Sequence, residues 1–239
     1  MATYNQWISG TGWTCLPEEE IDIWKFSLEL QKDDRQILSD DELKRFDQDD
    51  PRGQLDKRLA GRAHLRRILS KYTQSDPSEI SFTYENNRKP VLENHPDLSF
   101  NLSHSQNMGL IAVTQSRRVG VDLEYLEAER PFSKIAERFL TNNENNFINK
   151  YPEEERSQAF YQIWTLNEAY LKALGTGFSV SSNDFSVIPT NTRGRFLRET
   201  KVSPQTPQKW MFETLEVANS YLGALCFEGS DTVTRYWKV

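Results

Sequence analysis

Hydrophobic positions recur every three to four residues in two long stretches of the chain, and this period predicts two long helices. The first is expected over residues 55–72, where one buried face is formed by Leu65, Ile68, Leu69 and Tyr72. The second is expected from about residue 153 to residue 174, with an apolar face formed by Phe160, Ile163, Trp164, Leu171 and Leu174. The glycine that follows can adopt positive φ and close the C-cap of this helix.

Short runs rich in β-branched and aromatic residues predict strands around the long helices. In the first half of the chain these strands cover residues 21–30, 80–84, 99–102, 110–114 and 119–125, with an acidic connection around Asp33–Asp41. In the second half, two shorter helices are expected at 131–139 and 142–148, and strands at 185–188, 195–198, 209–217 and 221–227.

Each half of the chain therefore offers one long helix and several short strands. We predict an α+β protein of two similar α/β lobes related by pseudo-twofold symmetry, each with its long helix packed on a small, mainly antiparallel sheet. The lobes are expected to comprise residues 1–116 and 117–239. Since one chain supplies both lobes, a monomer could form a complete site between them.

Composition excludes several classes of protein. Hydrophobic residues make up 37% of the 239 residues and aromatic residues 12%, which excludes a mostly disordered chain. No apolar run is long enough to span a membrane and the first residues do not resemble a signal peptide, so we expect a cytoplasmic protein without membrane contact. The two cysteines and three histidines show no metal-ligand spacing, and a net charge of −6 argues against a general nucleic-acid binder.

Two carboxylates occur at alternating positions of the predicted strand 119–125. Asp122 and Glu124 would point to the same side of this strand, because side chains alternate between its two faces. Like charges at this spacing repel, so a partly buried pair needs a cation or a shared proton. The solvated face of an edge strand accounts for the pair equally well.

Another charged pair lies on the second long helix. Glu168 and Lys172 stand one turn apart, which for an isolated pair indicates an ordinary ion pair. If Glu168 instead joins Asp122 and Glu124, three carboxylates would suit a hard cation such as Mg²⁺, and Lys172 would lie beside the phosphate that such an ion binds.

Polar groups typical of phosphate binding occur in the first half of the chain. The segment FNLSHS, residues 100–105, is expected to form a turn after a strand, where Ser103 and His104 could donate to a phosphate or simply cap the turn. The first long helix carries Arg58, Arg62 and Arg66 at intervals of four residues, and Lys44-Arg45 forms a further basic cluster. These cations indicate either a solvated surface or a site for a multiply phosphorylated small ligand.

Four motifs in this order resemble a known family. They are RKP at 88–90, FNLSHS at 100–105, GVDLE at 120–124 and WTLNEAYLKALGTG at 164–177. Together they resemble the signature set of the 4'-phosphopantetheinyl transferases, specifically the two-lobed type that activates surfactin synthetase. The resemblance covers most of the span 43–177.

The resemblance implies transfer of the phosphopantetheine arm from coenzyme A to a serine of an apo carrier protein, with release of 3',5'-ADP. It implies that Mg²⁺, or Mn²⁺ in its place, is held on the coenzyme A pyrophosphate by Asp122, Glu124 and Glu168. Glu168 would be the base and Asp122 a further catalytic residue. Lys172 would contact the pyrophosphate and protonate or shield the leaving phosphate. The implied coenzyme A contacts are Lys89, Ser103, His104 and Lys172, to which the basic clusters add Arg45 and Arg58.

The implied partner is an acyl or peptidyl carrier protein of a fatty-acid, polyketide or nonribosomal peptide synthase. Its contact surface would follow the acidic strand, where Phe132, Ile135 and Phe139 recur at near-helical spacing, although these residues could equally be core.

One departure from the family pattern leaves an alternative open. The family usually has Lys where this chain has Asn167, so we expect one positive charge fewer near the phosphates, and weaker coenzyme A binding or slower turnover. The alternative is a catalytically weak regulator of the same fold that binds coenzyme A or a carrier.

Overall fold

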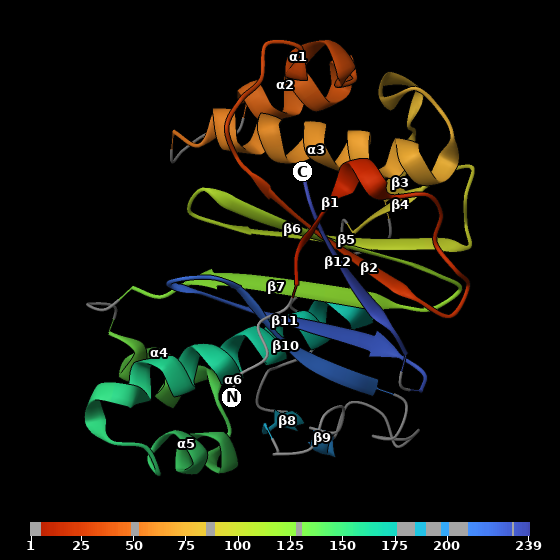
Figure 1. Ribbon diagram of the computed structural model, residues 1–239. Helices are drawn as coiled ribbons and strands as arrows, with labels where there is room; N and C mark the ends of the chain where they lie inside the picture. Colours follow the sequence, from red (N-terminus) through yellow and green to blue (C-terminus); the bar gives the residue numbers. More distant parts are fainter. Residues whose placement is uncertain are drawn as a thin grey trace.

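The computed structural model describes residues 6–48, 53–84, 89–127, 131–175, 185–189, 197–200, 210–230 and 232–239. Within them the chain forms four layers: a helical layer, a five-stranded sheet, a three-stranded sheet and a second helical layer (Figure 1). The two sheets face each other in the middle, and one long helix covers the outer face of each.

The first sheet has the strand order β1-β12-β2-β6-β5. Strands β2, β6 and β5 pair antiparallel, whereas β12 runs parallel to both β1 and β2. The long helix α3 packs on this sheet, with the short helices α1 and α2 beside it. The bounds are β1 Ile8–Ser9, β2 Ile21–Ser27, α1 Asp34–Ile37, α2 Asp40–Gln48, α3 Leu55–Thr73, β5 Leu98–Ser105, β6 Met108–Gln115 and β12 Thr234–Lys238, and a separate hairpin consists of β3 Phe82–Tyr84 and β4 Pro90–Leu92.

The second sheet has the antiparallel order β10-β11-β7, and the long helix α6 packs on its outer face. The bounds are β7 Val119–Tyr125, α4 Phe132–Phe139, α5 Asn142–Ile148, α6 Glu153–Leu174, β8 Phe185–Val187, β9 Leu197–Thr200, β10 Trp210–Ala218 and β11 Tyr221–Glu228. Helix α6 ends at Gly175, whose φ of 67° is the left-handed C-cap that its glycine permits.

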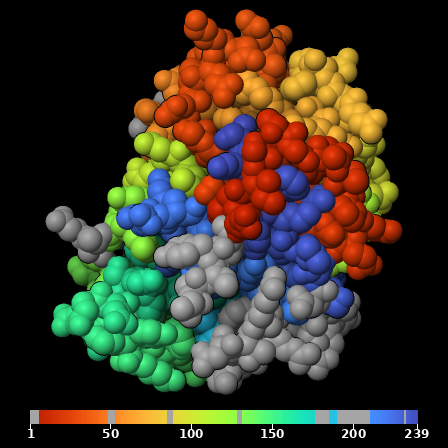
Figure 2. Space-filling model, viewed as in Figure 1, coloured from red at the N-terminus to blue at the C-terminus, as the bar shows by residue number. Residues whose placement is uncertain are grey.

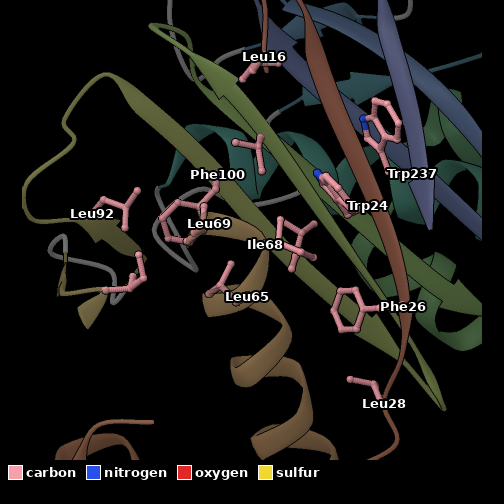
Figure 3. Close-up of a cluster of buried hydrophobic side chains, with 13 residues drawn as sticks. Leu16, Trp24, Phe26, Leu28, Leu65, Ile68, Leu69, Leu92, Phe100 and Trp237 are labelled. Atoms are coloured by element: carbon pink, nitrogen blue, oxygen red, sulfur yellow. The ribbon is translucent and has the colours of Figure 1, made fainter. Parts of the chain in front are cut away.

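Alternation along the strands explains the layers. In β2, Ile21 and Ile23 face the second sheet, while Trp24 and Phe26 face α3. Figure 3 shows the second of these groups, in which Trp24 and Phe26 pack with the helix residues Leu65, Ile68 and Leu69. Both faces of these central strands are therefore buried.

The predicted fold class is confirmed, and both long helices lie within a residue of their expected bounds. The acidic connection contains helices α1 and α2, which sequence periodicity did not predict because α2 has only two strongly apolar positions, Leu43 and Phe46. The prediction also lacked strand β12, which returns from the second half of the chain into the first sheet. Figure 2 shows this C-terminal segment in blue beside the N-terminal segment in red.

The part of the chain that the structure describes contains no helix that is both long and apolar enough to cross a membrane.

One buried carboxylate ties the returning strand to the first lobe. Asp22 is fully buried and accepts hydrogen bonds from Trp13, Tyr72, Arg235 and Trp237. Both indole donors and the Arg235 Nε lie 2.7 Å from a carboxylate oxygen. These partners come from the N-terminal segment, α3 and β12, so a single side chain joins three parts of the chain.

We predict that Asp22→Asn destabilises the protein by about 3 kcal/mol or more, because an amide nitrogen would face donors that the carboxylate satisfies. Urea unfolding monitored by circular dichroism measures this change. The matched control is Asp97→Asn at an exposed loop position, which should leave the midpoint unchanged. Equal midpoints for both variants would contradict the role given to Asp22.

Candidate active site at the junction of the two sheets

The site lies where edge strand β5 of the first sheet meets edge strand β7 of the second. The two strands belong to different sheets and are joined by side chains. The Val121 N–H donates to Asn101 Oδ1 at 2.8 Å, the Leu123 N–H to Ser103 Oγ at 3.3 Å, and the Tyr125 N–H to Ser105 Oγ at 3.0 Å. Every second residue of β5 thus accepts from every second main-chain N–H of β7.

The strand predicted at 99–102 is confirmed, but it continues to Ser105, so the expectation that FNLSHS forms a turn after this strand is wrong. These residues lie in strand β5, and His104 and Ser105 still pair with Gly109 and Met108 of β6. The segment resembles a turn in sequence because it is rich in polar residues. In the structure the side chains of these residues, and not main-chain groups, bond to β7. Asn101 and Ser105 therefore join Ser103 in linking β5 to β7. Their spacing of two residues on either side of Ser103 is the signal that could have shown that the strand continues to Ser105.

Helix α6 crosses the face of β7 that carries the acidic side chains. A Cβ added to Gly120 would lie 2.1 Å from the Ala169 carbonyl oxygen and 2.4 Å from the Ala173 nitrogen, so only glycine permits this approach. Two residues along the strand, Asp122 meets Lys172. Two further along, Glu124 meets Trp164. Gly120, Asp122 and Glu124 therefore all face helix α6.

Asp122, Lys172 and Ser103 form a compact polar group. The Lys172 Nζ lies 2.6 Å from Asp122 Oδ1 and 2.8 Å from Ser103 Oγ, and the Ser103 hydroxyl lies 2.9 Å from the same Asp122 oxygen. Asp122 is only 4% exposed, so a cation is needed to compensate its charge. Its second oxygen, Oδ2, is buried and makes no hydrogen bond.

Glu168 lies on the same helix, one turn before Lys172. Burial raises the pKa of the Glu168 carboxyl and repulsion from Asp122 raises it further, while Lys172 acts in the opposite direction. The charges of Glu168 and Asp122 thus affect each other across the contact between helix and strand. In the portions of the chain described here, no three His, Cys, Asp or Glu side chains gather into a metal-binding group, so Asp122, Glu124 and Glu168 do not form a closed ligand set.

Cations surround His104 beside this group. Desolvation lowers the pKa of the His104 imidazole, and the nearby charges of Lys172, Lys57 and Arg58 lower it further. Lys89 has partners within the protein, because its Nζ donates to the main-chain carbonyls of Lys172 at 2.9 Å and Val119 at 3.3 Å. It links the hairpin to the end of α6 and the start of β7.

The basic residues of α3 differ in their surroundings. Arg66 is 2% exposed and forms a structural ion pair with Glu42, at 2.8 Å between Arg66 Nη2 and Glu42 Oε2. Arg58 lies over the Phe46 ring. A hollow of about 420 Å³ between α2, α3 and β3 is lined by serines, by Arg45, Arg62 and Arg66, and by Asp41, Glu42 and Glu93. The buried Nη1 of Arg62 makes no hydrogen bond.

The expectation that position 167 lies near the phosphates is wrong. Asn167 is 2% exposed, and its Nδ2 donates to Glu144 Oε1 at 3.0 Å. Glu144 also accepts from the N–H groups of Thr141 and Val187, so Asn167 belongs to a buried network between α5, α6 and β8. This face of α6 is separate from the face that carries Lys172, and the residue does not mark a loss of charge at the site.

The three predicted carrier contacts lie on α4 and differ in exposure. Phe132 and Ile135 pack against the core cluster that includes Phe160. Phe139 is 38% exposed and meets the edge of Trp164, with ring centroids 6.1 Å apart. Phe139 therefore lies at the surface, whereas Phe132 and Ile135 pack largely against the core.

Comparisons with known proteins show the family of this chain. The family model of the 4'-phosphopantetheinyl transferase superfamily matches residues 118–226, and a model of the N-terminal part of 4'-phosphopantetheinyl transferases matches residues 23–116. The 4'-phosphopantetheinyl transferase HetI of Nostoc sp. is 31% identical over 230 residues, covering 93% of each chain. Sfp of Bacillus subtilis is 30% identical over 172 residues, covering 70% of this chain and 72% of Sfp.

A solved holo-(acyl-carrier-protein) synthase from Bacillus anthracis, in complex with coenzyme A, aligns with a TM-score of 0.39 and 26% identity over 47% of this chain and 96% of that one. The two sequence comparisons show that the chain belongs to the 4'-phosphopantetheinyl transferase superfamily. Within it, the chain is of the type to which Sfp belongs.

We predict that Gly120→Ala displaces α6 from β7 and destabilises the protein by roughly 1–3 kcal/mol, because the added methyl group would overlap main-chain atoms of Ala169 and Ala173. Urea unfolding measures the loss. Gly12→Ala is the control, since nothing lies within 4 Å of its added Cβ. A Gly120→Ala protein as stable as the control would show that the helix does not need this contact.

Proposed function

We propose that this protein transfers the 4'-phosphopantetheine arm of coenzyme A to a serine of an apo acyl or peptidyl carrier protein and releases 3',5'-ADP. The observation that carries the proposal is the buried Asp122–Lys172 pair with Ser103, beside Glu168, at the junction of the two sheets of a superfamily member. Because residues from both halves of one chain build this site, we propose that a monomer is sufficient, and that it acts in the cytoplasm.

The reaction places distinct demands on the two charged residues of α6. The carrier serine oxygen forms a bond to the phosphorus that bears the pantetheine arm, and the bond from this phosphorus to the bridging oxygen breaks. Glu168 is the proposed acceptor of the serine proton, directly or through a water. Lys172 would contact the pyrophosphate and stabilise or protonate the leaving phosphate, a role supported by its partly exposed position on the buried Asp122.

Two observations on the acidic groups of this site support a proposed divalent ion. Asp122 Oδ2 is a buried carboxylate oxygen that makes no hydrogen bond, and Glu168 is close enough for repulsion from Asp122 to raise its pKa. We propose that Asp122, Glu124 and Glu168 would hold Mg²⁺, or Mn²⁺ in its place, since carboxylates are the ligands these ions prefer. When bound, the ion would neutralise negative charge on the pyrophosphate.

The nucleotide end of coenzyme A is proposed to lie on the first lobe. His104 stands among Lys172, Lys57 and Arg58, so an anion there would meet several cations. Arg45 and the unpartnered Arg62 Nη1 line the neighbouring hollow, which supports further phosphate or ribose contacts. Lys89 and Ser103 complete the proposed contacts, although both also have internal partners.

The carrier is proposed to dock along α4. Exposed Phe139 is the best-placed apolar contact of the three, and Phe132 and Ile135 would shape the surface from below. A regulator without activity is disfavoured, because Asn167 belongs to the buried network and is no sign of decay at the site.

We predict that Glu168→Gln and Asp122→Asn each lower carrier labelling by roughly 100-fold or more, because one removes the proposed base and the other the charge partner of Lys172. Transfer is measured with an apo carrier, Mg²⁺ and a fluorescent coenzyme A analogue, and mass spectrometry verifies the attached arm. Exposed Glu153→Gln on the same helix is the control and should retain full rate. Near wild-type turnover in both site variants would overturn the mechanism.

We predict that coenzyme A binds more tightly as the pH falls toward the pKa of His104. In the free protein desolvation and neighbouring cations lower this pKa, and a bound phosphate would raise it, so binding takes up a proton. Calorimetry at pH 6 and pH 8 measures the change in Kd. His104→Ala should remove this part of the pH dependence while exposed His95→Ala retains it, and the same pH dependence in all three proteins would refute the assignment.

A further inference from the structure

The Ser103 side chain lies at the centre of the polar group between the two sheets. Its hydroxyl donates to Asp122 Oδ1 at 2.9 Å and accepts from the Lys172 Nζ at 2.8 Å and from the Leu123 N–H at 3.3 Å. A serine hydroxyl has one proton to donate and two lone pairs that accept, so these three bonds use its full capacity. Ser103 is only 5% exposed, and its bond to the β7 main chain fixes the place of the oxygen.

Ser103 selects the oxygen of Asp122 at which Lys172 is held. An isolated carboxylate offers two equivalent oxygens to an ammonium group, and the lysine stem that carries this group is flexible. Here the Ser103 hydroxyl donates to Oδ1, and the Lys172 Nζ lies 2.6 Å from that same oxygen. Asp122 Oδ2 is buried and makes no hydrogen bond. The serine therefore distinguishes two positions that attraction to Asp122 alone would leave equal.

This arrangement leaves Lys172 able to reach a substrate. The ammonium group has three N–H bonds, and among the described residues Asp122 and Ser103 accept two of them. The Lys172 side chain is 29% exposed, whereas the Asp122 side chain is 6% exposed. One N–H thus remains for an oxygen that approaches from solvent, and the other two bonds set its direction.

We propose that Ser103 is a positioning residue for Lys172: it holds the ammonium group at Asp122 Oδ1 and so keeps the third N–H available to the leaving phosphate. This inference rests on the proposed function, which gives Lys172 that task. It goes beyond the coenzyme A contact proposed for Ser103, because a phosphate oxygen needs a donor and the hydroxyl proton is used by Asp122. An N–H held in this way favours the transition state, in which charge develops on the leaving phosphate, more than it favours coenzyme A binding.

Ser103→Ala tests the proposal, and Ser105→Ala is its matched control. Both substitutions remove a β5 hydroxyl that accepts from a β7 N–H, but in the described part of the chain Ser103 is the one that also bonds to Asp122 and Lys172. The kcat for carrier labelling is measured, together with the Kd for coenzyme A by calorimetry without carrier. Nuclear magnetic resonance of the nitrogen-15-labelled free protein detects the Lys172 ammonium group, whose N–H signals are visible when hydrogen bonds slow their exchange with water. Their absence in Lys172→Arg assigns them.

We expect Ser103→Ala to lower kcat about tenfold and to leave the Kd for coenzyme A within about twofold of wild type, because the lost bonds position Lys172 in the transition state. The Lys172 ammonium signal should disappear from this variant. Ser105→Ala should keep the signal and should match the kcat and Kd of the wild-type protein.

An unchanged kcat in Ser103→Ala with a raised Kd for coenzyme A would overturn the positioning role and leave a direct contact with coenzyme A. Equal losses of kcat in both serine variants would also overturn it, because the shared loss of a bond to β7 would explain them. An unchanged ammonium signal in Ser103→Ala would overturn the inference whatever the activity. If the wild-type protein labels no carrier, the proposed function is refuted, while the ammonium signal still shows whether Ser103 holds Lys172.

Discussion

The site depends on the way strands β5 and β7 are joined. Adjacent strands usually exchange main-chain hydrogen bonds, but here β5 offers the side-chain oxygens of Asn101, Ser103 and Ser105 to the N–H groups of β7. The central member of this row also bonds to Asp122 and Lys172. The relative position of the two sheets and the geometry of the charged groups are therefore set by the same contacts.

The buried carboxylate of Asp122 needs a close and well-oriented cation, and the close packing of α6 against β7 supplies one. The absence of a side chain at Gly120 lets α6 approach β7 until Lys172 reaches Asp122 at 2.6 Å. The same approach brings Glu168 into the electrostatic field of Asp122 and Trp164 to Glu124. Gly120 thus sets how close Lys172 and Glu168 of α6 come to Asp122 of β7. The chemistry proposed for these charged residues depends on this packing of the helix against the strand.

Much of this could be predicted from the sequence wherever a strong local pattern exists. The stripe through Leu65 and Leu69 gave α3, and the ordered motifs gave the acidic residues and the family. Tertiary contacts decided the rest. The segment around Ser103 looks like a turn until β7 is placed beside it, and Asn167 looks like a lost surface charge until Glu144 is placed opposite. Arg66 likewise looks exposed although it is paired inside the fold with Glu42.

The position of β12 has a consequence for how the molecule acquires its structure. This strand lies between β1 and β2, and Trp237 contributes to the core beneath α3. More than 200 positions separate β12 from each of the two strands it pairs with, so these contacts have very high sequence separation. During translation the N-terminal half must wait, with an open edge on β2, until residue 238 has been synthesised. The first sheet is therefore completed only after the strand at the C-terminal end of the chain has become available.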